Sequence, residues 1–538
     1  MSRSHSFVPR RAFSAVALAA VCVGFVPRPV VAQDAPNAAA MARIRDEGFN
    51  HSQVMNLESW ITDVYGPRLT GSPYVKEAAD WVLTQLNGWG AANPHLEYWD
   101  FGGRGWVSDR FSAQVVAPHP FPIIAYPGAW SDGTNGPETG DVAIVHATST
   151  DDLAQYHGKL RGKWVMTSEP VALAPHFTPD AHRYTDEELA TMAAAEPAQP
   201  GAGGGGRGGR GGLDTAAFRR QREMTQALPK FLMDEGALGL LQLGRGDDGT
   251  VFVAATGSRA MDAPPALPTV VVASEHYGRI YRIVEKGIAV RVEVDAHNRF
   301  IDNGGKSFNI VAEIPGTDLK NEIVMLGGHF DSWQSATGAT DNAAGAVVML
   351  EAFRILKTLG LPMRRTVRVA LWTGEEEGLL GSRAYVREHF GYVDSTGAHL
   401  TPENAKIAGY FNLDNGTGAI RGVYLQGNEA VRPIFQQWLT PFADLGASTL
   451  TISNTGGTDH LSFDAVTIPG FQFIQDPIDY GSRTHHSNQD AYERVQPHDM
   501  MQNAVIVASF VYDAANRADK LPRKAAVIPA GRGGGRGE

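Results

Sequence analysis

The chain has 538 residues, of which 43% are hydrophobic and 20% charged, a balance typical of a soluble globular protein with two or three domains. Its formal net charge of -11 argues against nucleic acid as a partner, because the phosphate backbone selects basic proteins. The only cysteine, Cys22, lies within the first 32 residues, so the rest of the chain has no disulfide, cysteine nucleophile or thiolate metal ligand.

The first 32 residues have the parts of an export signal. Three arginines, Arg3, Arg10 and Arg11, precede an apolar run over residues 12–26, and Ala32 offers a small residue for cleavage before Gln33. The apolar run is short for a helix that spans a membrane. We therefore expect a signal peptide over residues 1–32, a secreted or periplasmic mature protein, and no membrane association once the signal is removed.

Residues 33–125 are predicted to form the N-terminal part of the catalytic domain. Residues 33 to about 50 are expected to be a loose terminus. Apolar residues then recur at helical spacing over 54–64 and again over 75–86, which predicts two helices.

Residues 126–290 predict a β-rich insertion, because short apolar strands such as 142–145 and 164–166 alternate with turns. Within the insertion, residues 201–212 are almost entirely glycine and arginine and predict a flexible, exposed loop. The same composition returns at the C-terminus, where residues 519–538 are predicted to be a flexible tail.

Residues 291–518 alternate between strands and helices and complete the predicted catalytic domain. The predicted buried strands are 323–326, 367–372, 407–413 and 468–474. This alternation predicts an α/β fold with a mixed central sheet and helices on both faces. In such sheets, active sites lie beyond the carboxyl ends of the strands.

Acidic residues or histidines follow each predicted strand. They are His329 and Asp331 after the first strand, Asp341 at the start of the next helix, Glu375 and Glu376 after the second strand, Asp414 at the end of the third, and His485 and His486 after the fourth. Any one of them could be a surface residue or a helix cap. Together, converging carboxylates would repel one another, and a divalent cation removes that repulsion. Histidine and carboxylate ligands without cysteine suit zinc, and also cobalt or manganese.

Five motifs occur in order along this part of the chain: Gly328–Ser332, Thr340–Gly345, Gly374–Ser382, Asn412–Asp414 and His486–Asp490. In this combination the chain resembles metallopeptidase family twenty-eight, the bacterial leucyl aminopeptidases and the plasma glutamate carboxypeptidase relatives. Residues 66–72 and 456–460 resemble the family's N-terminal segment and its substrate-side loop. The resemblance implies a zinc exopeptidase fold, two zinc ions per chain and peptide substrates. Residues 156–166 resemble a protease-associated domain, so the insertion is expected to be one.

The resemblance also implies a role for each of these residues. Asp341 would bridge the two ions, His329 and Asp414 would complete one metal site, and Glu376 and His486 would complete the other. Glu375 would be the general base that takes a proton from the attacking water. Asp331 would orient His329, as metal-bound histidines commonly require.

One position departs from the family pattern. Many relatives have a tyrosine just before the last metal histidine, and this chain has His485 there. His485 could donate a hydrogen bond to the oxyanion in place of that tyrosine, or it could be a bystander. His486 is preferred as the metal ligand because Asp490 lies four residues beyond it, as in the family. Glu377, the third acid of its run, is expected on the surface.

These observations predict an exported two-zinc metallo-exopeptidase, with aminopeptidase activity favoured. A carboxypeptidase or dipeptidase of the same family is the first alternative, and Arg483 could then hold a substrate carboxylate, although a structural ion pair is the favoured role of that arginine. A glutaminyl-cyclase-like acyltransferase and a non-catalytic, receptor-like binding protein are the others. The complete set of metal ligands and the base argue against both.

Overall fold

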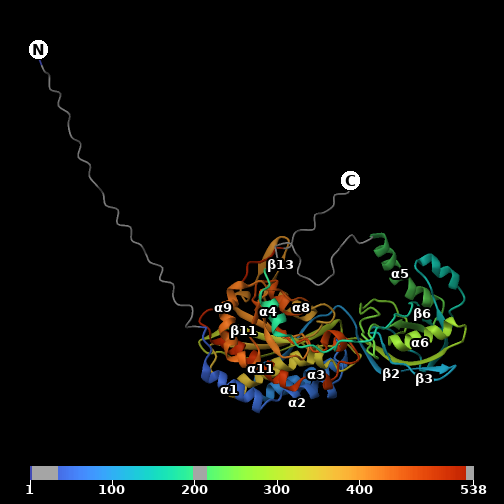
Figure 1. Cartoon of the computed structure of the whole chain (residues 1–538), viewed down its shortest axis with the longest axis horizontal. Helices are drawn as coiled ribbons and strands as arrows, with labels where there is room; N and C mark the ends of the chain where they lie inside the picture. The colour runs from blue at the N-terminus through green and yellow to red at the C-terminus, as the bar shows by residue number, and fades with distance from the viewer. Residues whose placement is uncertain (3–33, 198–214, 529–538) are drawn as a thin grey trace.

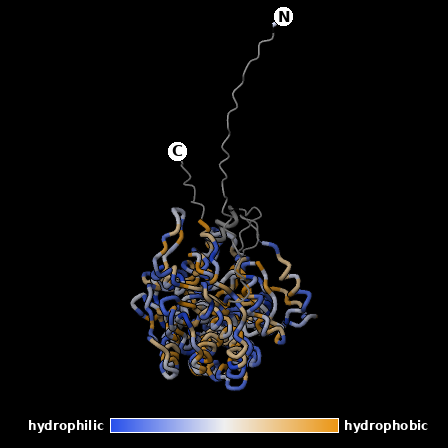
Figure 2. The backbone as a smooth tube through the Cα atoms, turned by 90° about the vertical axis from the view of Figure 1, so that its left-hand side faces the viewer, coloured by the Kyte–Doolittle hydropathy of each residue, from blue (hydrophilic) through white to orange (hydrophobic). Residues whose placement is uncertain are grey.

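The computed structural model describes residues 1–2, 34–197 and 215–528, without the side chains of 215–222. The predicted export signal and the Gly/Arg-rich loop at 201–212 lie outside these residues. Figure 1 shows the catalytic domain, with α1, α11 and β11, beside a second lobe that holds β2, β6 and α6. No helix in the described parts is long and apolar enough to cross a membrane. Hydrophobic and hydrophilic stretches alternate along the backbone there (Figure 2).

The catalytic domain is built on an eight-stranded mixed sheet. Its spatial order is β1 (Ala92–Asp100), β10 (Lys306–Ile314), β12 (Arg365–Trp372), β11 (Leu319–His329), β15 (Ile407–Asn412), β18 (Gly470–Gln475), β16 (Ile420–Tyr424) and β17 (Thr449–Thr451). The four central strands β12, β11, β15 and β18 are parallel, whereas β10 runs antiparallel to both β1 and β12, and β16 is antiparallel to β18 but parallel to β17. The predicted α/β fold with a mixed central sheet is therefore confirmed.

Successive residues of the central strands face opposite sides of the sheet, and each side packs against its own helices. In β11, Val324 and Leu326 join the core that includes α7 (Ala344–Leu359) and α11 (Pro497–Asn516). Ile323 and Met325 face a second core, which includes α8 (Leu380–His389) and α10 (His460–Asp464). Because both faces are covered, these strands have the continuous apolar sequences that made them recognisable.

The segment expected to be a loose terminus instead contains a helix, α1 (Ala38–Asn50). Ala40, Met41 and Ile44 are buried against α7 and α11, and the side chain of Asn37 caps the helix start. The expectation was wrong because a short apolar stripe at helical spacing is enough to hold a helix when a large core accepts it.

The second lobe contains another eight-stranded sheet. Its order is β3 (Phe121–Pro122), β2 (Gly105–Ala117), β9 (Arg291–Ile301), β5 (Glu138–Ile144), β6 (Lys163–Met166), β7 (Gly239–Leu243), β8 (Thr269–Val272) and β4 (Ala125–Pro127). Helix α6 (Ser274–Glu285) packs on this sheet through Tyr277 and Ile280. The sheet includes β2 and β9, which lie just outside the boundaries of 126 and 290 predicted for the insertion.

Two other segments join the domains or close the chain. Helix α4 (Asp186–Ala193), which follows β6 in sequence, lies against β17 of the catalytic sheet. The segment predicted as a flexible tail is held at its start: Leu521 is buried, and Lys524 forms an ion pair with Asp464. The start of that segment therefore packs on the catalytic domain, because the apolar Leu521 and the cationic Lys524 anchor it.

Candidate metal centre and active site

The predicted site residues meet at the carboxyl ends of the central strands. His329 is the last residue of β11, and Asp414 lies two residues after the end of β15. Asp341 lies in the turn before α7, where its backbone is not helical (φ -128°, ψ 89°). Glu375 and Glu376 follow β12, and His485 and His486 lie in the loop after β18. The crossover topology thus brings together His329 and His486, which lie 157 positions apart in the sequence.

The Asp341 carboxylate lies between two groups of potential ligands. Its Oδ1 is 3.4 Å from His329 Nε2, which is 3.3 Å from Asp414 Oδ1. Its Oδ2 is 3.4 Å from His486 Nε2, which is 2.9 Å from Glu376 Oε2. One oxygen of Asp341 therefore faces each group, which is the arrangement that a bridging carboxylate requires.

These residues fit a pair of divalent cations. Asp341 Oδ2 and Glu376 Oε1 are buried, and neither has a hydrogen-bond partner among the described residues. Buried carboxylate oxygens without a partner are costly, and a cation satisfies them. The donor atoms are imidazole nitrogens and carboxylate oxygens, a set that zinc accepts.

Asp331 is fully buried and links the two strand ends. His329 Nδ1 lies 3.0 Å from the Asp331 backbone carbonyl oxygen and 3.6 Å from its carboxylate. That carboxylate accepts hydrogen bonds from Thr70 Oγ1 at 2.8 Å and from the backbone N–H of Glu375 at 3.3 Å. Asp331 can therefore orient His329 through its carbonyl oxygen while its side chain fixes the loop that carries the two glutamates.

Burial and neighbouring charges shift the pKa of both adjacent glutamates, Glu375 and Glu376. Burial raises the pKa of the Glu375 carboxyl well above its usual range, the charge of His329 opposes this shift, and Asp414 adds to it. Burial, followed by the charge of Asp341, likewise raises the pKa of Glu376. A carboxylate whose pKa is raised toward neutrality accepts a proton more readily than an ordinary one.

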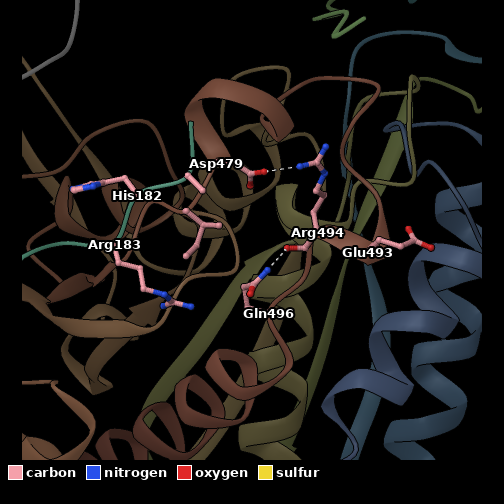
Figure 3. Close-up of a pocket in the computed structure, with 8 residues that line it drawn as sticks. His182, Arg183, Asp479, Glu493, Arg494 and Gln496 are labelled. Carbon is pink, nitrogen blue, oxygen red and sulfur yellow. Dashed lines mark hydrogen bonds and ion pairs between the residues drawn. The ribbon is translucent and has the colours of Figure 1, made fainter. Parts of the chain in front are cut away.

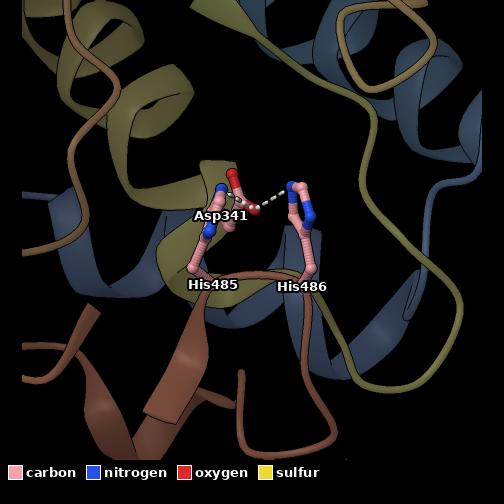
Figure 4. Close-up of side chains that lie close together, drawn as sticks. All are labelled: Asp341, His485 and His486. Atoms are coloured by element: carbon pink, nitrogen blue, oxygen red, sulfur yellow. Dashed lines mark ion pairs between the residues drawn. The ribbon is translucent and has the colours of Figure 1, made fainter. Parts of the chain in front are cut away.

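His485 and His486 occupy different positions beside Asp341. Figure 4 shows both rings directed toward the Asp341 carboxylate, from the same loop. His485 Nε2 is 3.9 Å from Asp341 Oδ2, and its side chain is 44% exposed, against 28% for His486. The two ring centroids are 3.8 Å apart, and the ring planes are tilted by 32°. His486 is the nearer of the two, and His485 is placed toward solvent.

Two residues of this loop have contacts that the sequence did not indicate. Tyr480 donates a hydrogen bond from its hydroxyl to Asp341 Oδ1 at 3.0 Å. The Asp490 carboxylate accepts hydrogen bonds from the backbone N–H groups of Thr340 at 2.6 Å and Asp341 at 3.1 Å. Asp490 was noticed only through its spacing from His486, and nothing in the local pattern singles out Tyr480.

Glu377 is not the surface residue that its position predicted. Both of its carboxylate oxygens are buried without a hydrogen-bond partner among the described residues. Burial, followed by the charge of Asp331, raises the pKa of Glu377 to about 8. The segment that holds Thr70 lies against the turn after β12, where the Gly374 N–H donates to Thr70 Oγ1 at 2.8 Å.

Arg483 is engaged in ion pairs with the inserted domain. Its guanidinium lies 2.6 Å from Asp180, 2.9 Å from Asp247 and 3.1 Å from Asp248. An arginine with three aspartate partners is poorly placed to bind a substrate carboxylate as well. This is the structural ion-pair role that the sequence favoured.

Comparisons with known proteins agree with this fold and site. Residues 309–511 match the profile of Peptidase family M28. The chain is 26% identical over 472 residues to Carboxypeptidase Q of Mus musculus, covering 86% of each chain. Its fold is similar to that of a Peptidase M28 precursor from Shewanella amazonensis SB2B (TM-score 0.62, 21% identity, 90% and 98% coverage). It is also similar to BSAP, a zinc aminopeptidase from Bacillus subtilis (TM-score 0.53, 18% identity, 87% and 96% coverage). Residues 309–511 therefore match the domain of peptidase family M28, and the similarity to Carboxypeptidase Q extends over most of the chain.

Proposed function

We propose that this protein is an exported aminopeptidase that uses two zinc ions, bridged by Asp341, and Glu375 as its general base. The observation that carries the proposal is the position of Asp341, whose two carboxylate oxygens face different groups of ligands. His329 and Asp414 would complete one site, and Glu376 and His486 the other. When bound, the metal pair would supply Lewis acidity toward the scissile carbonyl and lower the pKa of water.

The side chains would carry out the proton transfers and the positioning. Glu375, with its raised pKa, would accept a proton from the attacking water and later deliver it to the leaving amine. Asp331 would keep His329 in one orientation through its backbone carbonyl oxygen. His485 lies close enough to Asp341, at 3.9 Å, to donate a hydrogen bond to a substrate oxygen held nearby.

The charge of the surroundings supports recognition of an amine. Burial raises the pKa of Glu375 most, and the charges of Asp414 and Asp459 add to this shift. Burial raises the pKa of Asp459 to about 7. Arg483 is already paired with three aspartates. A site with this excess of carboxylates favours the positive end of a peptide over its negative end.

A carboxypeptidase is the second candidate, and two observations favour it. The similarity to Carboxypeptidase Q extends over most of both chains. In addition, Arg245 of the inserted domain is exposed and lies over the Phe252 ring, 5.4 Å from its centroid. The neighbouring Val253 donates a hydrogen bond from its N–H to the His486 carbonyl oxygen at 2.8 Å. Arg245 would then be the cation nearest the metals that could hold a substrate carboxylate.

Blocked dipeptides distinguish the two candidates. We expect hydrolysis of leucyl-alanine and its C-terminal amide, and loss of activity toward N-acetyl-leucyl-alanine. Arg245→Ala should leave the rates on the free dipeptide and the amide within about twofold of each other, as expected of a residue outside the reacting centre. Rapid hydrolysis of the N-acetyl peptide, together with a large rise in KM in Arg245→Ala and partial rescue in Arg245→Lys, would assign carboxypeptidase activity instead.

A further inference from the structure

The loop that carries His486 is held differently from the rest of the metal centre. His329 ends a buried strand, and its side chain is 1% exposed, whereas the side chain of His486 is 28% exposed. His486 also has a positive φ of 60°, in the left-handed region that non-glycine residues rarely adopt. A residue in that conformation keeps it only where its surroundings impose it. The contacts around this loop therefore determine where the imidazole of His486 lies.

On the catalytic side, side chains before and after the histidine hold the loop: Tyr480 and Thr484 before it, and Asp490 beyond it. Asp490 accepts hydrogen bonds from the backbone N–H groups of Thr340 and Asp341, at 2.6 and 3.1 Å. This contact ties the end of the loop to the turn that carries the bridging carboxylate. Before His486, Tyr480 donates to Asp341 Oδ1 at 3.0 Å and Thr340 Oγ1 donates to Thr484 Oγ1 at 2.7 Å, and the inserted domain adds its own contacts to these.

On the other side, the inserted domain pairs with the loop through its backbone. The Val253 N–H donates to the His486 carbonyl oxygen at 2.8 Å, and the Asn488 N–H donates to the Val251 carbonyl oxygen at 3.2 Å. The Asn488 side chain completes the pairing by accepting from the Val251 N–H at 2.7 Å. Residues 251–253 of the insertion thus pair with residues 486–488 in an isolated antiparallel β-bridge.

Arg483 adds side-chain contacts to this backbone pairing. Its Nε donates to Asp180 at 2.7 Å, and its NH1 group donates to the side chains of Asp247 and Thr250, both at 2.9 Å. Its NH2 group donates to Asp248 at 3.1 Å. All of these acceptors belong to the segment between β6 and β8, and the Arg483 side chain is only 10% exposed. The carbonyl oxygen of Arg483 in turn accepts a hydrogen bond from the Ser487 hydroxyl, next to the metal ligand.

We propose that Arg483 is a positioning residue through which the inserted domain holds His486 in place as a metal ligand. The inference rests on the proposed function, because it assumes that His486 and Glu376 bind one of two ions. Loss of the arginine would let the segment before His486 move, which weakens the site built from His486 and Glu376. The site built from His329 and Asp414 would keep its affinity, because strand ends of the catalytic sheet hold both of its unshared ligands.

The chain offers a matched control a few residues away. Arg183 belongs to the same connecting segment as Asp180, and it also crosses to the catalytic domain, where it pairs with Asp476 at 2.9 Å and Asp499 at 2.8 Å. It lines a cavity of about 370 Å³ together with Asp479 and Arg494 (Figure 3). Removing Arg183 thus breaks ion pairs between the domains without touching the partners of Arg483.

The test is a titration of metal-free protein with zinc, together with steady-state kinetics. In Arg483→Ala, we expect one zinc affinity to stay at the wild-type value and the other to fall by about 10–100-fold, the usual effect of losing a group that orients a ligand. Turnover should fall at limiting zinc and recover with excess zinc, while KM changes little. Arg483→Lys should restore part of the affinity, Asp247→Asn should give a smaller version of the same defect, and Arg183→Ala should resemble the wild type.

Two results would overturn the inference. In one, Arg483→Ala matches Arg183→Ala in both zinc affinities. In the other, both zinc sites weaken equally and in proportion to a loss of thermal stability, which would mark Arg483 as a general structural residue. A wild-type protein that binds no zinc at all would instead refute the proposed function, so the two failures can be told apart.

Discussion

The adjacent glutamates Glu375 and Glu376 should fail in different ways when each is changed to glutamine. Glu376 Oε2 lies 2.9 Å from His486 Nε2, and its Oε1 is buried without a partner. Changing it to glutamine removes an anionic donor from one metal site. We expect the zinc affinity of that site to fall by at least about 10–100-fold, because even residues that only support a ligand have an effect of that size.

Glu375→Gln should behave differently because its side chain is assigned to proton transfer. The substitution keeps the size of the side chain and leaves intact the hydrogen bond from its backbone N–H to Asp331. It removes only the proton acceptor. Turnover should fall by roughly 10²–10⁴-fold, or about 3–5 kcal/mol of transition-state stabilisation. Substrate binding should change little, because the lost interaction belongs to the transition state.

The assay measures zinc per chain by elemental analysis, and turnover with and without added zinc, on both variants side by side. Excess zinc should restore part of the activity of Glu376→Gln and none of that of Glu375→Gln. If Glu375→Gln loses zinc while Glu376→Gln keeps it, the two roles are reversed. If neither substitution affects activity, the reasoning that places the active site here is refuted.

Two further predictions concern metal and pH. Removal of metal by a chelator should abolish peptidase activity and lower the melting temperature, because the converging carboxylates then repel one another. About two zinc ions per chain should restore both activity and melting temperature. Full activity of protein shown to be metal-free would contradict this prediction. Burial, and then the charge of Asp34, raises the pKa of Asp513 to about 8, so the folded state holds a proton there that the unfolded state releases near pH 4. The stability that this provides is complete below about pH 4 and is lost as the pH rises toward 8, by up to about 1.4 kcal/mol per pH unit. The free energy of unfolding of Asp513→Asn, measured with denaturant and compared with that of the wild type, should therefore rise between pH 5 and pH 8. An equal difference between variant and wild type at both pH values would rule the explanation out.

The central strands could be predicted from the sequence because both of their faces are buried. Strands β11 and β12 contain the apolar runs 323–326 and 369–372, and residues suited to metal chemistry follow each run. The edge strand β1 is mostly half-exposed, and β17 has only three residues. Neither has a pattern that separates it from a loop, since burial and not backbone preference makes a strand recognisable.

The site residues that follow strand ends could be predicted from the sequence. The residues whose contacts depend on tertiary packing could not. Glu377 lies beside two acids with assigned roles, and its sequence position gave no sign that its carboxylate would be buried. Tyr480 reaches Asp341 only because its loop folds back over the bridging carboxylate. The partners of Arg483 lie more than 230 positions earlier in the chain, in the inserted domain. Contacts of this kind depend on how two domains meet, which local patterns do not encode.

The two halves of the metal centre therefore have different structural origins. His329 and Asp414 project from the ends of parallel strands, and their side chains are 1% and 8% exposed. Their positions are set by the hydrogen bonds of the sheet and by the cores on both of its faces. His486 instead depends on a loop with a left-handed backbone, tied on one side to Asp341 through Asp490 and on the other to the inserted domain. Because Asp341 is shared by both halves, a displacement of that loop would reach the buried half only through this one carboxylate. The inserted domain can thus affect one metal ligand strongly while the catalytic sheet keeps the other half in place.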